Sequence, residues 1–313
     1  MNLTRIMARA ASGIAVLLLA LALSEVAMAQ ESRGDESYAV FVSQRNGAAE
    51  LFLIEVNTRQ VSQLTNTGRG HLTPAVSSNR SIVFASREGS NYEIFSGTLS
   101  AALRSRRPTL VGINRLTVNT EDETAATTTR DGAWVSFLSG KGIEVMGAGG
   151  MDRKVIVPAS ELAVDFSPAI SPDASRVAFV SNRGGEYEIW LYSSVNAELR
   201  QLTRGAKAAG GLGWSADGKQ IVFNTTATSG ESGIGMASVE TGSFRVLTDK
   251  GDFNGSLSAR GDRMLFTSTR DGDAELYLLN VGSGSVERLT FNAGMDDGAV
   301  FVTEQVRPGR ATR

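Results

Sequence analysis

Acidic residues recur at equivalent positions of a repeated pattern in this sequence, and the single histidine stands at one of these positions. Carboxylates gathered at one opening can attract a basic peptide or coordinate a cation such as Ca²⁺. A histidine can exchange a proton near neutral pH. We align the repeats on Pro74, Ala125, Pro168, Leu212, Gly255 and Gly298. Three positions earlier stand His71, Asp122, Asp165, Ala209, Asp252 and Met295, and Glu123 and Asp296 follow at the next position. The candidate binding residues are therefore His71, Asp122, Glu123, Asp165, Asp252 and Asp296.

Three roles compete for these residues. The first is structural, because an aspartate can accept backbone hydrogen bonds where the chain begins each repeat. The second is binding of a basic peptide or of Ca²⁺, the one cofactor that we consider. The third is hydrolysis of glycosides by paired carboxylates, which needs one raised and one ordinary pKa at a defined separation. The sequence leaves all three roles open.

Other kinds of chemistry are excluded by composition and motif. With His71 as the only histidine and no cysteine in the chain, neither a two-histidine metal site nor a thiolate site can form. The sequence contains no Gly-x-Ser-x-Gly nucleophile turn and no Gly-Lys-Ser/Thr phosphate loop. A formal net charge of −2 provides no basic field for nucleic acid. We therefore expect no nucleic-acid partner.

The candidate residues belong to a unit that the chain repeats with varying fidelity. A Leu-Thr pair ends the units, and its successive copies are separated by 52, 86, 45 and 42 residues. The interval of 86 residues is two units of 43, and the hidden unit runs from Glu123 to about Ser160, which gives six copies. The second strand of every unit ends in a phenylalanine, from Phe41 to Phe266. The pairs are Leu64-Thr65, Leu116-Thr117, Leu202-Thr203, Leu247-Thr248 and Leu289-Thr290.

The unit from Asp165 to Thr203 contains four short apolar clusters separated by turn residues. Short clusters rich in β-branched and aromatic residues favour strands over a helix. A period near 44 residues with four strands per unit is typical of β-propeller blades. We therefore predict an all-β, six-bladed propeller of four-stranded antiparallel blades. In this fold the first strand of each blade lines a central channel, so the candidate residues would ring one mouth. We expect the three tryptophans to pack in the core, and Trp214, on a channel-lining strand, is the best candidate among them for a binding surface instead.

The predicted ring needs a strand from the far end of the chain. The first unit begins with a strand of the second type, Tyr38–Phe41, and lacks a first strand of its own. The segment Gly298–Phe301 follows the last Leu-Thr pair at nearly the offset at which Gly255–Ser258 follows the pair before it. We predict that this C-terminal strand completes the N-terminal blade. The interlock would close the ring and remove free sheet edges, which otherwise template aggregation.

Both ends of the chain lie outside the repeats. Residues 1–29 combine a positive start, ten apolar residues from Ile14 to Leu23 and a small-residue site ending at Ala29, which is typical of a signal peptide cleaved after Ala29. An apolar run of this length is too short to span a bilayer, so we expect no transmembrane segment in the mature chain. We assign residues 30–37 to a linker, 38–306 to the propeller and 307–313 to a disordered basic tail, and we note an insertion from Ser96 to Gly112 whose role the sequence does not assign.

With Ser-Pro-Asp-like first turns, Ser-Asn-Arg-Gly-like second turns and terminal Gln-Leu-Thr, the region from Tyr38 to Val302 resembles the propeller domain of the TolB family. The resemblance implies a periplasmic protein of Gram-negative envelopes that binds other proteins at one propeller face and its channel mouth. It also implies that the protein is not a catalyst. The partner that it implies is an envelope protein or lipoprotein, such as a peptidoglycan-associated one. The family's namesake carries an α/β domain ahead of the propeller, but only eight residues separate Ala29 from Tyr38 here.

We therefore expect a non-catalytic, monomeric, periplasmic binding module with no cofactor, and we keep Ca²⁺ in the channel as the alternative. The alternative is a carbohydrate-active propeller enzyme, a glycosidase or a lyase, that uses channel carboxylates. Such blades also occur in peptidases and carbohydrate-active enzymes, and a fold alone does not determine a function.

Overall fold

The structure is a computed structural model that describes residues 35–100, 103, 108–226 and 230–304. Residues 36–303 form one compact unit. The signal peptide expected at 1–29, the first part of the linker expected at 30–37 and the tail expected at 307–313 lie outside the described residues.

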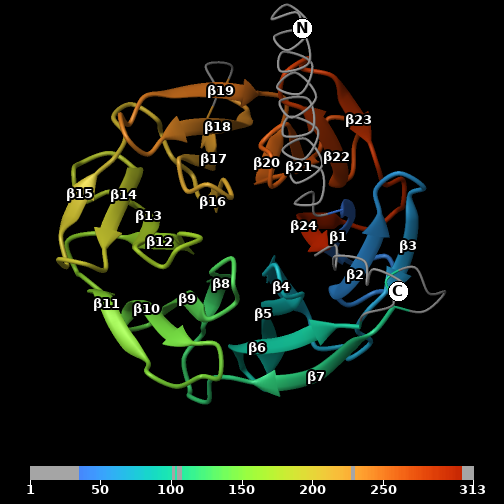
Figure 1. Cartoon of the computed structure of the whole chain (residues 1–313), viewed down its shortest axis with the longest axis horizontal. Helices are drawn as coiled ribbons and strands as arrows, with labels where there is room; N and C mark the ends of the chain where they lie inside the picture. Colours follow the sequence, from blue (N-terminus) through green and yellow to red (C-terminus); the bar gives the residue numbers. More distant parts are fainter. Residues whose placement is uncertain (1–34, 101–102, 104–107, 227–229, 305–313) are drawn as a thin grey trace, which may run out of the picture. The chain divides into compact units, whose positions relative to one another are not determined.

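The strands of this unit form six four-stranded sheets, which stand as blades around a ring (Figure 1). Consecutive strands of a blade pair antiparallel, as in blade 4. The predicted all-β, six-bladed propeller is confirmed. Blades 1 to 3 consist of β24 (Asp296–Glu304), β1 (Asp35–Ser43), β2 (Glu50–Glu55) and β3 (Gln60–Gln63); β4 (His71–Val76), β5 (Ser81–Glu88), β6 (Asn91–Leu99) and β7 (Leu110–Arg115); and β8 (Thr124–Thr128), β9 (Trp134–Ser139), β10 (Gly142–Gly147) and β11 (Lys154–Pro158). Blades 4 to 6 consist of β12 (Asp165–Ile170), β13 (Arg176–Ser181), β14 (Glu188–Ser193) and β15 (Leu199–Gln201); β16 (Gly213–Trp214), β17 (Gln220–Thr226), β18 (Ser232–Ser238) and β19 (Phe244–Thr248); and β20 (Asp252–Leu257), β21 (Arg263–Ser268), β22 (Glu275–Asn280) and β23 (Val286–Arg288).

The hydrophobic core lies between neighbouring blades. Phe84 of blade 2 packs in one cluster with Val40 and Leu51 of blade 1, and Phe41 of blade 1 packs in another with Leu265 of blade 6. A four-stranded sheet has two faces to cover, so each blade depends on both of its neighbours. The second strand of every blade contributes one fully buried phenylalanine: Phe41, Phe84, Phe137, Phe179, Phe223 and Phe266.

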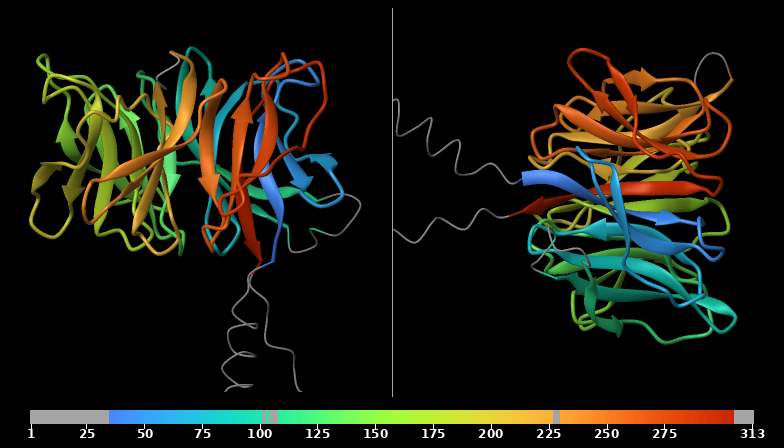
Figure 2. Two further views of the ribbon diagram at one scale, coloured as in Figure 1. Left: turned by 90° about the horizontal axis from the view of Figure 1, so that it is seen from above. Right: turned by 90° about the vertical axis from the view of Figure 1, so that its right-hand side faces the viewer.

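The two ends of the described chain meet in blade 1, where β24 is the innermost strand and pairs with β1 (Figure 2). The predicted closure of the N-terminal blade by the C-terminal strand is confirmed. β1 begins at Asp35, three residues before the strand expected from Tyr38. Phe301 of β24 is buried in the cluster that contains Phe41 and Leu265. Because β24 fills the inner position of blade 1, that blade has four strands like the other five, and the strand pairing joins the two ends of the ring.

A backbone irregularity recurs in the innermost strand of every blade. The pairing of β12 with β13 shifts register between Phe166 and Ala169, and Ser167 between them has a φ of 49°. Non-glycine residues rarely adopt a positive φ, and each such residue costs of order 1 kcal/mol. In each blade the equivalent residue, which lies in the innermost strand or just before it, has a φ between 36° and 64°: Thr73, Ala125, Ser167, Gly211, Asn254 and Gly298.

We predict that Phe301→Ala lowers the free energy of unfolding by about 3 kcal/mol, because it leaves a cavity in the cluster that joins blades 1 and 6. Urea denaturation measures the change. Leu162→Ala, at a side chain that is 93% exposed, is the control and should change stability by less than about 0.5 kcal/mol. Equal effects of the two substitutions would mean that β24 does not hold the ring together.

Candidate functional site

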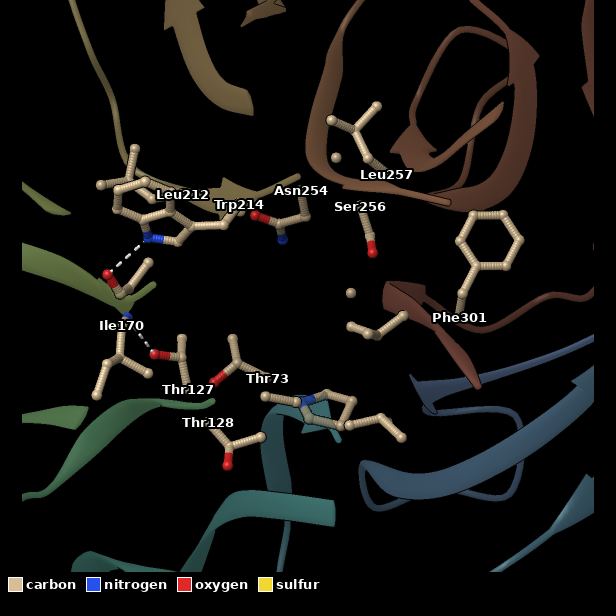
Figure 3. A pocket seen from close by; sticks show the side chains of 18 of the residues that line it. Thr73, Thr127, Thr128, Ile170, Leu212, Trp214, Asn254, Ser256, Leu257 and Phe301 are labelled. Carbon is tan, nitrogen blue, oxygen red and sulfur yellow. Dashed lines mark hydrogen bonds between the residues drawn. The ribbon is translucent and has the colours of Figure 1, made fainter. Parts of the chain in front are cut away.

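The innermost strands of the six blades surround a central cavity of about 320 Å³ (Figure 3). Blades 2 to 6 each contribute the positive-φ residue, the three residues after it and one residue of the turn that follows; in blade 4 these are Ser167–Ile170 and Pro172. Blade 1 contributes Gly298–Phe301 and Thr303 of β24. The turns that follow the innermost strands are residues 77–80, 129–133, 171–175, 215–219 and 258–262, and we call the side of the ring that carries them the first-turn face. The cavity therefore reaches from the ring of positive-φ residues to the first-turn face.

The wall of this cavity is nearly neutral. Among the lining residues, all of them in the described part of the chain, only Glu36 and Arg130 are charged. Glu36 is already engaged, because it accepts a hydrogen bond from the Ala259 backbone N–H and lies 3.5 Å from Arg263. The residue three positions after the positive-φ residue is apolar in five of the six blades, and we call this set the collar: Val76, Thr128, Ile170, Trp214, Leu257 and Phe301.

Hydrogen bonds between blades fix the orientation of the wall. Trp214 Nε1 donates to the Ala169 carbonyl of blade 4 at 2.9 Å, and the Ile170 backbone N–H donates to Thr127 Oγ1 of blade 3 at 2.9 Å (Figure 3). Trp214 lies on β16 and lines the channel, as the sequence predicted. The indole thus presents an apolar ring at a defined position, since its polar atom is bonded within the wall.

Further around the ring from these bonds, polar side chains link blades 5, 6 and 1. The Asn254 backbone N–H donates to Asn224 Oδ1 at 2.8 Å, and Asn254 Nδ2 donates to Asp297 Oδ1 at 2.9 Å. Thr267 Oγ1 donates to the same Asp297 oxygen at 2.7 Å. Asn254 is one of the positive-φ residues, so this chain of hydrogen bonds holds its strained backbone in place.

The structure places most of the candidate acidic residues inside the protein. None of the six candidates is among the described residues that line the channel. Asp122 is exposed and accepts a hydrogen bond from the Tyr92 backbone N–H at 2.8 Å. The others are buried or nearly so and paired: Asp165 with Arg183 at 2.6 Å, Asp252 with Arg270 at 2.7 Å, Asp296 with Arg45 at 2.8 Å, Glu123 with Arg153 at 2.6 Å and His71 with Glu50 at 3.1 Å. This geometry favours the structural role, and the binding role stays a prediction.

The strand register corrects the alignment of the repeats in two blades. Asp165 pairs with Ser181 and lies two residues before the positive-φ residue Ser167. Glu123 and Asp296 also lie two residues before the positive-φ residue of their blades, so they are the equivalents of Asp165 in blades 3 and 1. The sequence alignment had put Asp122 and Met295 at that place. The error is one residue, because Ala125 and Gly298 correspond to Thr73 in blade 2 and not to Pro74.

An arginine in the turn after the second strand holds the buried carboxylate. Arg183 Nε donates to Ser181 Oγ at 2.9 Å, and its guanidinium lies 5.1 Å from the centre of the Phe179 ring and 5.4 Å from Trp190. The guanidinium therefore binds Asp165 while it packs between two aromatic rings, which desolvates the pair and strengthens it. The same arrangement recurs with Arg45 over Phe41 and Phe52, and with Arg270 over Phe266 and Tyr277. The Ser-x-Arg spacing marks these arginines in the sequence, but their role as partners of the buried carboxylates was not predicted.

In blade 3 the arginine that binds the buried carboxylate comes from a different position, just before the fourth strand. Its second and third strands are joined by a two-residue turn within Ser139–Gly142, which leaves no room for an arginine. Arg153, which precedes β11, instead binds Glu123 and Glu144, both at 2.6 Å, and lies 5.0 Å from the centre of the Phe137 ring. Burial raises the pKa of Glu123, and Arg153 offsets part of that rise.

A glutamate near the start of the third strand holds the end of blade 2. Glu93 accepts hydrogen bonds from Thr117 Oγ1 at 2.6 Å, from Arg115 Nη2 at 2.9 Å and from the Asn119 backbone N–H at 2.9 Å. Burial raises the pKa of Glu93, but these hydrogen bonds outweigh it and hold the pKa below the usual value for glutamate. Thr117 belongs to a Leu-Thr pair, so the threonine of this pair bonds the end of blade 2 to its third strand.

We predict that Asp252→Ala lowers the free energy of unfolding by about 3 kcal/mol, because it leaves the Arg270 guanidinium without its buried partner. The matched control is Asp122→Ala, whose carboxylate is exposed and should contribute less than about 1 kcal/mol. Urea denaturation measures both. An Asp252→Ala variant with unchanged stability but impaired ligand binding would restore the binding role of these residues.

Glu93→Gln should cost about 2 kcal/mol at pH 7, because a neutral amide accepts these hydrogen bonds more weakly. The pKa of Glu93 is lower in the folded than in the unfolded state, so its contribution is full above the unfolded value of about 4.3 and disappears as pH falls through the folded value. Urea denaturation at pH 7 and pH 3 should therefore show the difference between wild type and variant shrinking with acidification. Glu161→Gln, at an exposed side chain, should show no such dependence.

Comparisons with known proteins agree with this architecture. The family model of the TolB beta propeller domain matches residues 126–267. A TolB homolog of Chlorobium chlorochromatii is 29% identical over 127 residues, which are 41% of this chain and 29% of that protein, so the match spans less than a third of the relative's length. Among solved structures, TolB from Acinetobacter baumannii has a TM-score of 0.73 at 19% identity, covering 85% of this chain and 66% of that one. Oligogalacturonate lyase from Vibrio parahaemolyticus has a TM-score of 0.53 at 15% identity, covering 77% and 86%. Residues 36–303 of this chain therefore form a six-bladed β-propeller, and residues 126–267 within it are similar to the TolB beta propeller domain.

Proposed function

We propose that this protein is a non-catalytic binding module of the periplasm, which engages an envelope protein or lipoprotein through one propeller face and the mouth of its channel. The observation that carries the proposal is the neutral channel wall, with an apolar collar next to one face. Apolar side chains at the edge of a recess can receive side chains of a partner, and aromatic residues there contribute much of the binding energy.

The periplasmic location is supported by the sequence of residues 1–29, which has the pattern of a cleavable signal peptide. Within the described residues, no helix has the length and apolar character that crossing a membrane requires. The similarity to TolB proteins supports a partner in the cell envelope.

A carbohydrate-active enzyme is the second candidate, because a lyase shares the fold. Glycoside cleavage by two carboxylates needs both of them at the substrate. Among the described lining residues Glu36 is the only carboxylate, and it is held by Ala259 and Arg263. The wall of this channel therefore favours binding over this chemistry.

We predict that Trp214→Ala lowers capture of an envelope protein by the mature chain, residues 30–313, by at least about tenfold, because the indole is the largest side chain of the collar. Affinity capture from solubilised envelope, followed by mass spectrometry, measures the loss. The matched control is Trp134→Ala, whose indole is 38% exposed on β9 and does not line the channel. Equal capture by both variants would contradict a role for the channel, and turnover of an oligosaccharide by the wild type would support the enzyme instead.

A further inference from the structure

The first-turn face carries a second hollow beside the mouth of the channel. This hollow has a volume of about 490 Å³ and lies against the first turns of blades 4 and 5. Arg130, Pro172, Trp214 and Ala216 line both the hollow and the channel, so the two spaces share a wall. An extended ligand on this face can therefore occupy both at once.

Three cationic side chains surround the hollow. Arg130, Arg176 and Lys219 all line it and are all exposed. Arg130 extends from blade 3 across to blade 5, where its Nη1 lies 3.5 Å from the Ala216 carbonyl oxygen. Within the described ranges none of the three forms an ion pair, whereas the arginines that hold the buried carboxylates, such as Arg183 and Arg270, do. The guanidinium groups of Arg130 and Arg176 are thus open to a ligand. The pKa of Asp217 is lowered by the hydrogen bonds that it accepts from Ser215 and from the Lys219 backbone, and after these also by the Lys219 ammonium.

The two aspartates of the hollow are turned to their own backbone. Asp173 Oδ1 accepts hydrogen bonds from Ser171 Oγ at 2.6 Å and from the Ser175 backbone N–H at 3.0 Å. Asp217 Oδ1 accepts from Ser215 Oγ at 2.7 Å and from the Lys219 backbone N–H at 3.0 Å. These carboxylates stabilise the turns, so the side chains that remain to bind a ligand here are cationic.

We infer that the protein partner docks on the first-turn face and presents an acidic segment, with an apolar side chain in the collar and carboxylates against Arg130, Arg176 and Lys219. This inference rests on the proposed function and names the face and the chemistry of its partner. The recessed collar suits a side chain that enters from outside, and arginine binds carboxylates with two parallel hydrogen bonds. The predicted mouth with His71, Asp165 and Asp252 lies at the other ends of the same strands.

The test is selection of peptides from a random twelve-residue phage library on the immobilised mature chain, residues 30–313. Enriched peptides should carry net negative charge and at least one large apolar residue, and a synthesised representative should bind more weakly as salt rises. Its Kd should rise at least about tenfold in the triple variant Arg130→Glu, Arg176→Glu, Lys219→Glu. The control is Lys141→Glu, Arg204→Glu, Lys207→Glu, which makes the same charge change at exposed residues of the opposite face and should alter Kd less than about twofold.

Neutral or basic enriched peptides, no enrichment on folded protein, or equal losses in the two triple variants would each overturn the inference. Sedimentation with phosphatidylglycerol vesicles is the second measurement. We call the variant with Arg130→Glu, Arg176→Glu and Lys219→Glu the first-turn variant. If no peptide is enriched, and the wild type and the control variant bind the vesicles while the first-turn variant does not, the cations bind a lipid surface and the inference is overturned. If the first-turn variant captures an envelope protein as well as the wild type does, the proposed function stands, but the first-turn face is not the binding site.

Discussion

The propeller depends on how it buries a carboxylate at the start of the innermost strands. Taking such a charge out of water costs several kcal/mol unless a cation and further hydrogen bonds compensate it. In blades 1, 4 and 6 the arginine of the second turn supplies both, because it binds the carboxylate and packs on two aromatic rings. This contact fixes where the innermost strand begins, and the position of the bulge and of the channel wall follows from it.

One result of this arrangement is that acidic residues are numerous near the axis but scarce on the channel wall. Asp165 and Asp252 end inside the blades, while the wall is made by the small and apolar residues that follow the bulge. A channel of this composition can accept neutral groups without the desolvation cost that an unpaired carboxylate would impose. Charge for recognition is then supplied at the face, where Arg130, Arg176 and Lys219 remain solvated.

The period, the turn residues and the missing first strand were enough to predict the fold and its closure by Gly298–Phe301 from the sequence. The placement of Trp214 on the wall could also be predicted, because it depends only on which strand is innermost. Whether the Asp165 side chain faces the channel mouth or the inside of the blade could not be predicted. Aspartate suits both a solvated mouth and a buried ion pair, and only the position of Arg183 decides between them. Register failed at Ala125 and Gly298, because small residues give no signal that distinguishes neighbouring positions of a bulge.

Blade 3 shows what this fold requires of its sequence. Arg153 lies just before the fourth strand and yet brings its guanidinium onto Phe137 and Glu123, where blades 1, 4 and 6 use an arginine of the second turn. Evolution in such a repeat can therefore transfer an essential group from one loop to another while the loop it leaves shortens freely. A blade that has lost its signature motif can in this way keep its mechanical role, and loops on that face become available for new partners.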